Sequence, residues 1–248
     1  MSTIAGAGII TQARMGSTRL PGKVLLTARG ISMLQYQVER LRVSKLPLYI
    51  ATTIRPEDDA IERHAEQLGV ACFRGDVDDV LSRYYEAATH FKLATVVRVT
   101  SDCPLLDGGL IRSAVERYAE AANPSLYISN GITRTFPRGL DFEVFSYALL
   151  AQAQENARTA SDREHVTPYI HQNRSGQVQI EQVVRQADAS HYRLTLDTAE
   201  DFRLLQELLE RYRADTLSTD ELISLLDQHP ELVAINAAVE QKKYDFTK

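Results

Sequence analysis

One short segment near the N-terminus combines small residues with positive charge. Residues 12–23 read Q-A-R-M-G-S-T-R-L-P-G-K and directly follow the first apolar run of the chain. Gly16 and Gly22 let the backbone turn its N–H groups toward an anion. The polar donors of the segment are Gln12, Ser17, Thr18, Arg14, Arg19 and Lys23. Hydroxyls, backbone N–H groups and three cations together favour a loop that holds a triphosphate.

Two better-known phosphate-binding patterns do not fit this segment. A Walker A loop has four residues between its glycines and then Lys-Ser/Thr, whereas five residues separate Gly16 from Gly22 here and Val24 follows Lys23. The Gly6-Ala7-Gly8 run lies inside the first expected strand instead of opening a helix, so it is poor support for a dinucleotide fingerprint. An ordinary polar loop is the remaining alternative.

Two acidic residues each follow an apolar run. Asp102 lies in T-S-D-C-P-L-L-D, where Pro104 forces a turn, and Asp197 ends R-L-T-L-D just before a helix that begins after Thr198. Mg²⁺ binds one or two protein carboxylates together with phosphate oxygens and water, so these acids are candidate metal ligands. A turn-forming role for Asp102 and a helix-start role for Asp197 explain the same positions.

Apolar runs alternate with amphipathic stretches through the first half of the chain. Strands are expected over 4–10, 46–51, 70–73 and 94–99, and helices over 33–41, 57–68, 80–91 and 110–121. This alternation predicts an α/β fold with a mainly parallel sheet flanked by helices. Its ligand-binding loops should lie at the carboxyl ends of the strands.

The pattern changes after residue 140. Alternating runs over 140–145 and 192–196 predict two more strands. Helix starts are expected at Ser161/Glu164, Thr198/Asp201 and Ser218/Glu221, and two final helices are broken at His229-Pro230. We expect a single domain over 1–248, with a nucleotide-binding half over 1–125, an acceptor half over 126–215 and C-terminal helices over 216–248.

Composition limits the class of partner. The 248 residues carry a formal charge of −5, which argues against a nucleic-acid-binding protein, yet residues 1–50 hold seven Lys/Arg and one acid. This imbalance favours a local site for a small polyanion, although Arg40, Arg42 and Lys45 are equally well explained as solvated helix charges.

The cysteines and the hydropathy point to a reduced compartment. Cys72 and Cys103 form no C-x-x-C pair and no zinc-type cluster. No run of apolar residues approaches the ~20 needed to cross a bilayer. We therefore expect a cytoplasmic protein that has neither a membrane-spanning segment nor a structural zinc site.

Several sequence blocks resemble those of a known enzyme family. The run A-R-M-G-S-T-R-L-P-G-K-V-L resembles the opening of the cytidylyltransferases that activate acidic sugars, such as the 3-deoxy-manno-octulosonate and acylneuraminate cytidylyltransferases. It is most similar to the spore coat polysaccharide biosynthesis protein F group. Further blocks follow in family order, among them F-R-G-D-V-D-D-V-L-S-R-Y, S-D-C-P-L-L-D, R-G-L-D-F-E-V-F, D-R-E-H-V-T-P-Y and L-T-L-D-T-A-E-D-F.

The resemblance implies a fold, a reaction and a set of site residues. It implies a Rossmann-like sheet of the nucleotide-diphospho-sugar transferase type, a homodimer, and Mg²⁺-dependent transfer from CTP to a small, acidic sugar. Arg14, Arg19 and Lys23 would hold the triphosphate, and Asp102 and Asp197 the metal. The remaining nucleotide contacts it implies are Gln12, Ala13, Gly16, Ser17, Thr18, Arg74 and Asp79. The sugar contacts it implies are Arg134, Arg138, Asp141, Glu143, Arg163 and His165.

Simpler roles compete at several of these positions. Arg74 is equally well explained as a surface partner of Asp76 or Asp78, and Asp79 as a helix cap. His165 is more often a packed or surface histidine than a catalytic one.

Two other functions stay open. A glycosyltransferase of related fold would use a D-x-D metal motif, which this chain has only at Asp76-Val77-Asp78. A nucleotide-binding homologue without turnover is the second alternative. It draws on Ser101, which stands where relatives commonly have glycine and whose side chain would crowd the phosphates.

Overall fold

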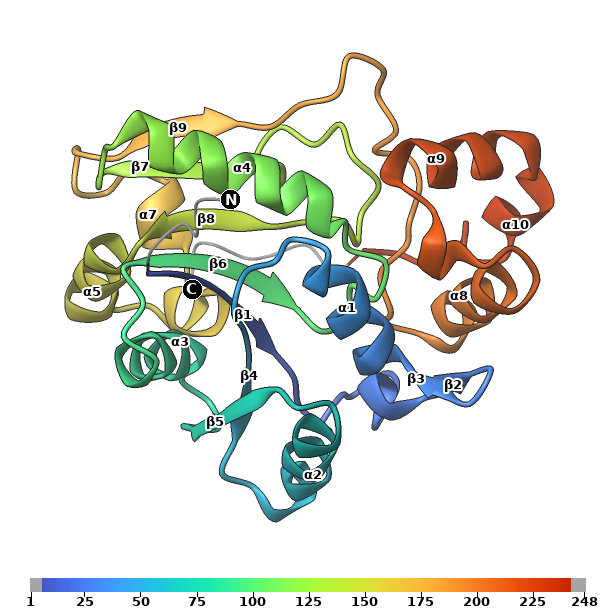
Figure 1. Ribbon diagram of the computed structural model, residues 1–248, viewed down its shortest axis with the longest axis horizontal. Coiled ribbons are helices and arrows are strands. Elements are labelled where there is room, and N and C mark those ends of the chain that lie inside the picture. The colour runs from blue at the N-terminus through green and yellow to red at the C-terminus, as the bar shows by residue number, and fades with distance from the viewer. Residues whose placement is uncertain (1–5, 242–248) are drawn as a thin grey trace.

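A seven-stranded sheet forms the centre of the protein, of which the computed structural model describes residues 6–241 (Figure 1). The strand order is β5-β4-β1-β6-β8-β7-β9. Their bounds are Ala7–Gln12 (β1), Leu48–Thr53 (β4), Ala71–Gly75 (β5), Thr95–Thr100 (β6), Leu126–Ser129 (β7), Glu143–Ser146 (β8) and Gln179–Gln182 (β9). Only the β8 pairings with β6 and β7 are antiparallel. The predicted mainly parallel sheet is confirmed.

Helices cover both faces of this sheet because both faces of its strands are apolar (Figure 1). One face packs on α3 (Val80–His90), α5 (Tyr147–Asn156) and α7 (Pro168–His171). The other packs on α1 (Met33–Arg42), α2 (Asp59–Gln67) and α4 (Gly108–Ala121). In β1, the neighbours Ile9 and Ile10 are both fully buried, on opposite faces.

The strand predictions for the first half are confirmed, with shifted ends. The first begins at Ala7; the start of the expected run at Ile4 lies outside the described residues. In the second half, β8 begins at Glu143, three residues after the expected start. The expected strand over 192–196 is wrong. This segment is extended, but it forms only an isolated bridge between Arg193 and Arg138.

The C-terminal part packs as a separate layer of helices against a short hairpin, β2 (Thr27–Ala28) and β3 (Ile31–Ser32). These helices are α8 (Ala199–Arg211), α9 (Thr219–Gln228) and α10 (Pro230–Ala234). The predicted break at His229-Pro230 is confirmed, as are the capping boxes that begin α8 and α9.

One predicted helix start is wrong. Helix α6 (Ala160–His165) is capped by Thr159 together with Asp162, not by Ser161 with Glu164. Asp162 is fully buried and also accepts a hydrogen bond from Arg174 at 2.7 Å. The cap therefore sits two residues earlier, where its carboxylate has a second partner.

Arg40 is neither a polyanion ligand nor a solvated charge. It is 8% exposed, and its guanidinium donates to the backbone carbonyls of Leu106, Ala214, Asp215 and Leu217. It joins α1 to the turn before α4 and to η3 (Ala214–Thr216). Within residues 6–241 no helix is long and apolar enough to cross a membrane.

Candidate active site

The basic loop leaves the carboxyl end of β1 and winds around Met15. Backbone N–H groups of Ser17 and Gly22 both donate to the Met15 carbonyl, at 2.9 and 3.0 Å. The Met15 N–H donates in turn to Oδ1 of buried Asp58 at 2.7 Å. Gly22 has a left-handed φ of 67° and begins the turn η1 (Lys23–Leu25). The loop is thus anchored to the body of the protein, and its cations project from a fixed backbone.

A cavity of about 290 Å³, here called the loop cavity, lies beside this segment. Its wall includes six of the residues predicted from the loop: Gln12, Arg14, Ser17, Thr18, Arg19 and Lys23. Ser101 belongs to the same wall, is 5% exposed, and donates its N–H to the Gln12 carbonyl at 3.0 Å. The cavity therefore has basic and hydroxyl donors on one side and the end of β6 on the other.

Asp102 and Asp197 meet across this cavity, although 95 positions separate them. The extended segment 192–196 brings them together, because the Leu196 N–H donates to the Asp102 carbonyl at 2.7 Å. Lys23 Nζ then contacts both carboxylates, at 3.4 Å from Asp102 Oδ2 and 2.8 Å from Asp197 Oδ1. Arg19 and Arg193 each contact Asp197 Oδ2 at 3.1 Å.

This cluster fixes the charge state of its members. Burial alone would lower the pKa of Lys23, but the nearby carboxylates of Asp102 and Asp197 outweigh it and raise that pKa. Burial alone would raise the pKa of Asp197, but Lys23, Arg19 and Arg193 together lower it. At neutral pH Lys23 is therefore protonated and Asp197 ionised.

The same geometry tests the fit of a divalent cation. In the described chain, no group of three or more His, Cys, Asp or Glu could hold a metal ion. Mg²⁺, however, commonly uses one or two carboxylates and takes its other oxygens from phosphates and water. The Lys23 ammonium stands between two carboxylates, which shows that both can reach one cation. Asp102 and Asp197 therefore fit a Mg²⁺ bound together with a triphosphate.

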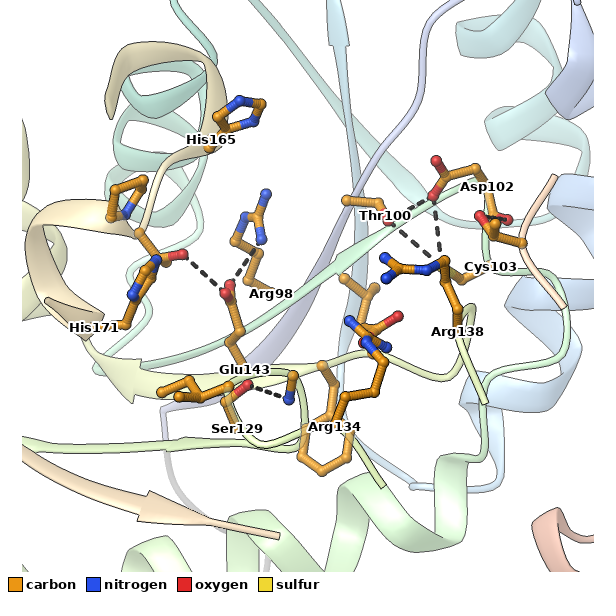
Figure 2. Close-up of a pocket in the computed structure, with 18 of the residues that line it drawn as sticks. Arg98, Thr100, Asp102, Cys103, Ser129, Arg134, Arg138, Glu143, His165 and His171 are labelled. Atoms are coloured by element: carbon orange, nitrogen blue, oxygen red, sulfur yellow. Dashed lines mark hydrogen bonds and ion pairs between the residues drawn. The ribbon is translucent and has the colours of Figure 1, made fainter. Parts of the chain in front are cut away.

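A second cavity, about 480 Å³ and here called the sheet cavity, opens beside β6, β7 and β8 (Figure 2). Figure 2 shows His165 and His171 on one side of it, Arg134, Arg138 and Asp102 on the other, and Arg98 and Glu143 between them. The two cavities share six wall residues: Arg98, Thr100, Asp102, His165, Asp197 and Gln241. They are therefore adjoining compartments with a common boundary at Asp102 and Asp197.

Acids and bases in the sheet cavity are paired with one another. Arg134 binds Asp141, whose other oxygen accepts the Gly139 N–H at 3.0 Å. Gly139 has a φ of 100°, and a Cβ there would lie 2.5 Å from the backbone of Leu194. Only glycine lets this loop approach segment 192–196 closely enough to place Arg138 and Asp141 on the cavity.

Glu143 is the most heavily bonded acid of this cavity. Its Oε2 accepts from Arg98 at 2.8 Å, and its Oε1 accepts from Tyr127 Oη and Thr167 Oγ1, each at 2.8 Å. Both Arg98 and Glu143 are 16% exposed. Three donors hold the Glu143 carboxylate, so it is an ordered part of the wall and not a free base.

The two histidines of the sheet cavity are held neutral. Burial lowers the pKa of His165 below its ordinary value; the Glu164 charge opposes this shift in part, and the Arg98 charge adds a smaller lowering. Burial also lowers the pKa of His171. Neutral imidazoles can accept or donate a hydrogen bond to a ligand hydroxyl.

Five of the predicted site residues do not line either cavity in the described part of the chain. Ala13 is buried, and Gly16 lies in the loop itself. Arg74 pairs with Asp59 and Glu62 at 2.7 and 2.9 Å, not with Asp76 or Asp78. Asp79 caps α3 and is bound by Arg163. These last two residues join α3 to α6, so their nearest role is to position elements around the site.

Sequence reasoning missed four residues that lie in the shared wall or contact it. Arg98 and Thr100 lie on the cavity face of β6, and Arg193 and Gln241 come from the C-terminal part. The Arg193 guanidinium contacts Asp197 and Asp201 and donates to Gln241 Oε1 at 2.5 Å. A charged residue inside the apolar run T-V-V-R-V-T was the available signal for Arg98. For Gln241 no local pattern exists.

Comparison with known proteins agrees with this architecture. Residues 8–245 match the family described as Cytidylyltransferase. The chain belongs to the cytidylyltransferase family. It is accordingly an enzyme of the nucleotidyltransferase class, as the ordered sequence blocks predicted.

Individual relatives extend over nearly the whole chain. An uncharacterized protein of Methanocaldococcus jannaschii is 38% identical, with 95% of this chain and 96% of that protein covered. The spore coat polysaccharide biosynthesis protein SpsF of Bacillus subtilis is 34% identical, with 90% and 94% covered. A solved cytidylyltransferase structure from Leptospira borgpetersenii has a TM-score of 0.88 at 33% identity, with 97% and 99% covered. The cytidylyltransferase fold thus applies to the described chain as a whole.

Proposed function

We propose that this cytidylyltransferase transfers the CMP group of CTP to a hydroxyl of a small acidic sugar, with Mg²⁺, for surface polysaccharide or glycoconjugate biosynthesis. One observation carries the proposal: the two cavities share a boundary that includes Asp102, Asp197 and Arg98. A transfer between two substrates needs them in adjoining compartments with the reacting atoms at the boundary.

The loop cavity suits the nucleotide triphosphate. It gathers Arg14, Arg19 and Lys23 with the hydroxyls of Ser17 and Thr18. Cations and hydroxyl donors on a fixed loop bind phosphate oxygens without further ordering. Family membership and the SpsF relative support CTP as the nucleotide and a sugar as the acceptor.

The sheet cavity suits the sugar. Paired charges such as Arg134 with Asp141 offer hydrogen bonds to several hydroxyls, and Arg138 adds a guanidinium for an acidic group. His165 and His171 contribute neutral ring nitrogens. The mixture of donors and acceptors fits a polyhydroxylated ligand better than an apolar one.

The reaction forms one bond and breaks another at the α-phosphorus. The sugar hydroxyl oxygen attacks in line, the bond from the α-phosphorus to the bridging oxygen breaks, and pyrophosphate leaves with that electron pair. The hydroxyl proton is lost to water. Asp102 and Asp197 would hold Mg²⁺, which when bound draws negative charge from the phosphate oxygens. Lys23 would exchange its carboxylate contacts for phosphate contacts.

The described residues give little support to a glycosyltransferase. Asp76 of the D-x-D run accepts hydrogen bonds from the N–H groups of Asp78 and Asp79, each at 2.8 Å, and so closes the turn before α3. That run lies outside both cavity walls. The homodimer and the cytoplasmic location implied by the sequence stay predictions.

Pyrophosphate release tests the proposal. The protein is incubated with Mg²⁺, each of the four nucleoside triphosphates in turn, and a panel of acidic and neutral sugars. We expect release with CTP that depends on an acidic sugar. Sugar-dependent release with UTP or GTP instead of CTP would refute the cytidine assignment. Saturable CTP binding with no pyrophosphate release in the presence of any of the sugars would favour the non-catalytic alternative.

A further inference from the structure

We propose that Arg98 is a catalytic residue whose guanidinium contacts the α-phosphate as the acceptor hydroxyl attacks it. The proposal rests on the proposed function, because it assigns the α-phosphate to the boundary between the two cavities. Neither the sequence blocks nor the family match singled out this residue.

Position is the first argument. Arg98 lies near the end of β6, on the strand face that also presents Thr100, and it lines both the loop cavity and the sheet cavity. The other charged residues common to both walls are Asp102 and Asp197, which are the proposed Mg²⁺ ligands. The shared wall therefore carries a permanent cation, Arg98, in addition to these two carboxylates.

Burial and partial pairing are the second argument. The Arg98 side chain is 16% exposed, and one terminal nitrogen donates to Glu143 Oε2 at 2.8 Å. Its Nε is buried and, within residues 6–241, has no hydrogen-bond partner. Its guanidinium lies 5.5 Å from the centre of the Tyr84 ring. A buried ion pair of this kind is a weak source of stability, so a role in binding charge explains the arginine better than a structural role.

The orientation of the guanidinium is the third argument. Tyr127 and Thr167 hold the Glu143 carboxylate, and that carboxylate holds one edge of Arg98. Figure 2 shows the guanidinium extending from Glu143 toward His165, into the cavity. Glu143 is therefore a positioning residue that fixes the direction of the positive charge.

A fixed guanidinium at this position suits the attack on the α-phosphorus. Negative charge is redistributed over the α-phosphate oxygens while the new bond to the sugar oxygen forms and the bond to pyrophosphate breaks. A cation that is already oriented needs no reorganisation at that moment, and removing one such donor typically costs about 10²–10³-fold in rate. The effect should appear in turnover, because CTP is already held by Arg14, Arg19 and Lys23 in the loop cavity.

The main experiment compares Arg98→Met and Arg98→Lys with the wild type by pyrophosphate release. Arg112→Met is the matched control. The Arg112 side chain is 25% exposed, pairs with Glu116 at 2.6 Å, and lies at another cavity that includes Gly6 and Ala7. We expect Arg98→Met to lower kcat by about 10²-fold with little change in KM for CTP, and Arg112→Met to keep wild-type kcat.

Sulfur substitution at the α-phosphate separates a catalytic role from a structural one. Each diastereomer of CTPαS replaces one non-bridging α-oxygen. If Arg98 contacts one of these oxygens, the rate ratio between the diastereomers will differ between the wild type and Arg98→Lys. A merely structural role would lower both rates equally. Glu143→Gln serves as a second variant if Arg98→Met does not fold, and we expect about a 10-fold lower kcat with a retained melting transition.

The outcomes discriminate between the two proposals. Wild-type kcat and an unchanged diastereomer ratio in folded Arg98 variants would overturn the Arg98 assignment while the proposed function stands. Absence of CTP-dependent release in the wild type, with CTP bound, would overturn the proposed function and this inference with it. A lower kcat with an altered ratio supports both.

Discussion

The loop cavity and the sheet cavity are built in opposite ways. The cations of the loop cavity come largely from one continuous segment, residues 12–23, which follows β1 and is anchored through Met15 to Asp58. The sheet cavity draws its polar groups from β6, β7, β8, α6 and the loop before β8. Two of the three loop cations contact carboxylates only at the boundary, through Asp102 and Asp197, whereas the charges of the sheet cavity are paired within its own wall.

This difference teaches where chemistry and selectivity reside. A triphosphate makes the same demand whatever the acceptor is, so one compact loop can meet it. A sugar is recognised by several hydroxyls in different directions, which requires donors and acceptors from several elements. Substitutions in the first cavity should therefore abolish transfer with any acceptor, and substitutions in the second should change the use of the acceptor.

The largest effect is expected at Lys23. Lys23→Met removes the cation that lies between Asp102 and Asp197, and we expect kcat/KM for CTP to fall by about 10³-fold. Pyrophosphate release measures it. Lys92→Met is the control, because Lys92 borders the separate cavity beside Phe91 and Leu93. Full activity of a folded Lys23→Met enzyme would remove the loop from the mechanism.

A smaller and more selective effect is expected at Arg134. Arg134→Met removes the partner of Asp141 in the sheet cavity, so KM for the acceptor should rise about 10- to 100-fold while KM for CTP stays near its wild-type value. Initial rates measured with one substrate varied at a time give the two KM values separately. A rise in KM for CTP of the same size would show that the two cavities do not serve different substrates.

Acid should weaken the boundary between the cavities. The pKa of Asp197 is lower in the folded protein than its ordinary value, so the ion pairs contribute stability above about pH 4, and this contribution is lost as the pH falls through the lowered pKa. Urea unfolding at several pH values gives the free energy of unfolding as a function of pH. Asp197→Asn should make this dependence flatter below about pH 4. An unchanged dependence would contradict the coupling of Asp197 to Lys23 and Arg19.

The smallest effect is expected at Ser101. Ser101→Gly removes a buried hydroxymethyl group from the wall of the loop cavity, and we expect kcat/KM for CTP to rise by about 2- to 3-fold. Steady-state kinetics would resolve a change of this size. A loss beyond about 10-fold would mean that the hydroxyl binds substrate, and Ser101 would then belong with the donors of the loop.

More of the loop cavity than of the boundary with the sheet cavity could be predicted from the sequence, for a physical reason. Local spacing was enough for the loop, for the strands that precede Asp102, and for the capping boxes of α8 and α9, because these depend on neighbours in the chain. Arg98 was missed because a lone arginine in an apolar strand has no local pattern that indicates what it faces. The role of segment 192–196 was missed for a similar reason, since its partners, residues 102 and 138, are distant in sequence.

The most direct test of the account is ³¹P NMR of CTP, Mg²⁺, the protein and the sugar that supports pyrophosphate release. We predict that the three CTP signals disappear together, and that pyrophosphate and one phosphodiester signal of a CMP-sugar appear in equal amounts. Formation of CDP with orthophosphate, or of pyrophosphate with free CMP only, would contradict transfer of the CMP group across the shared boundary.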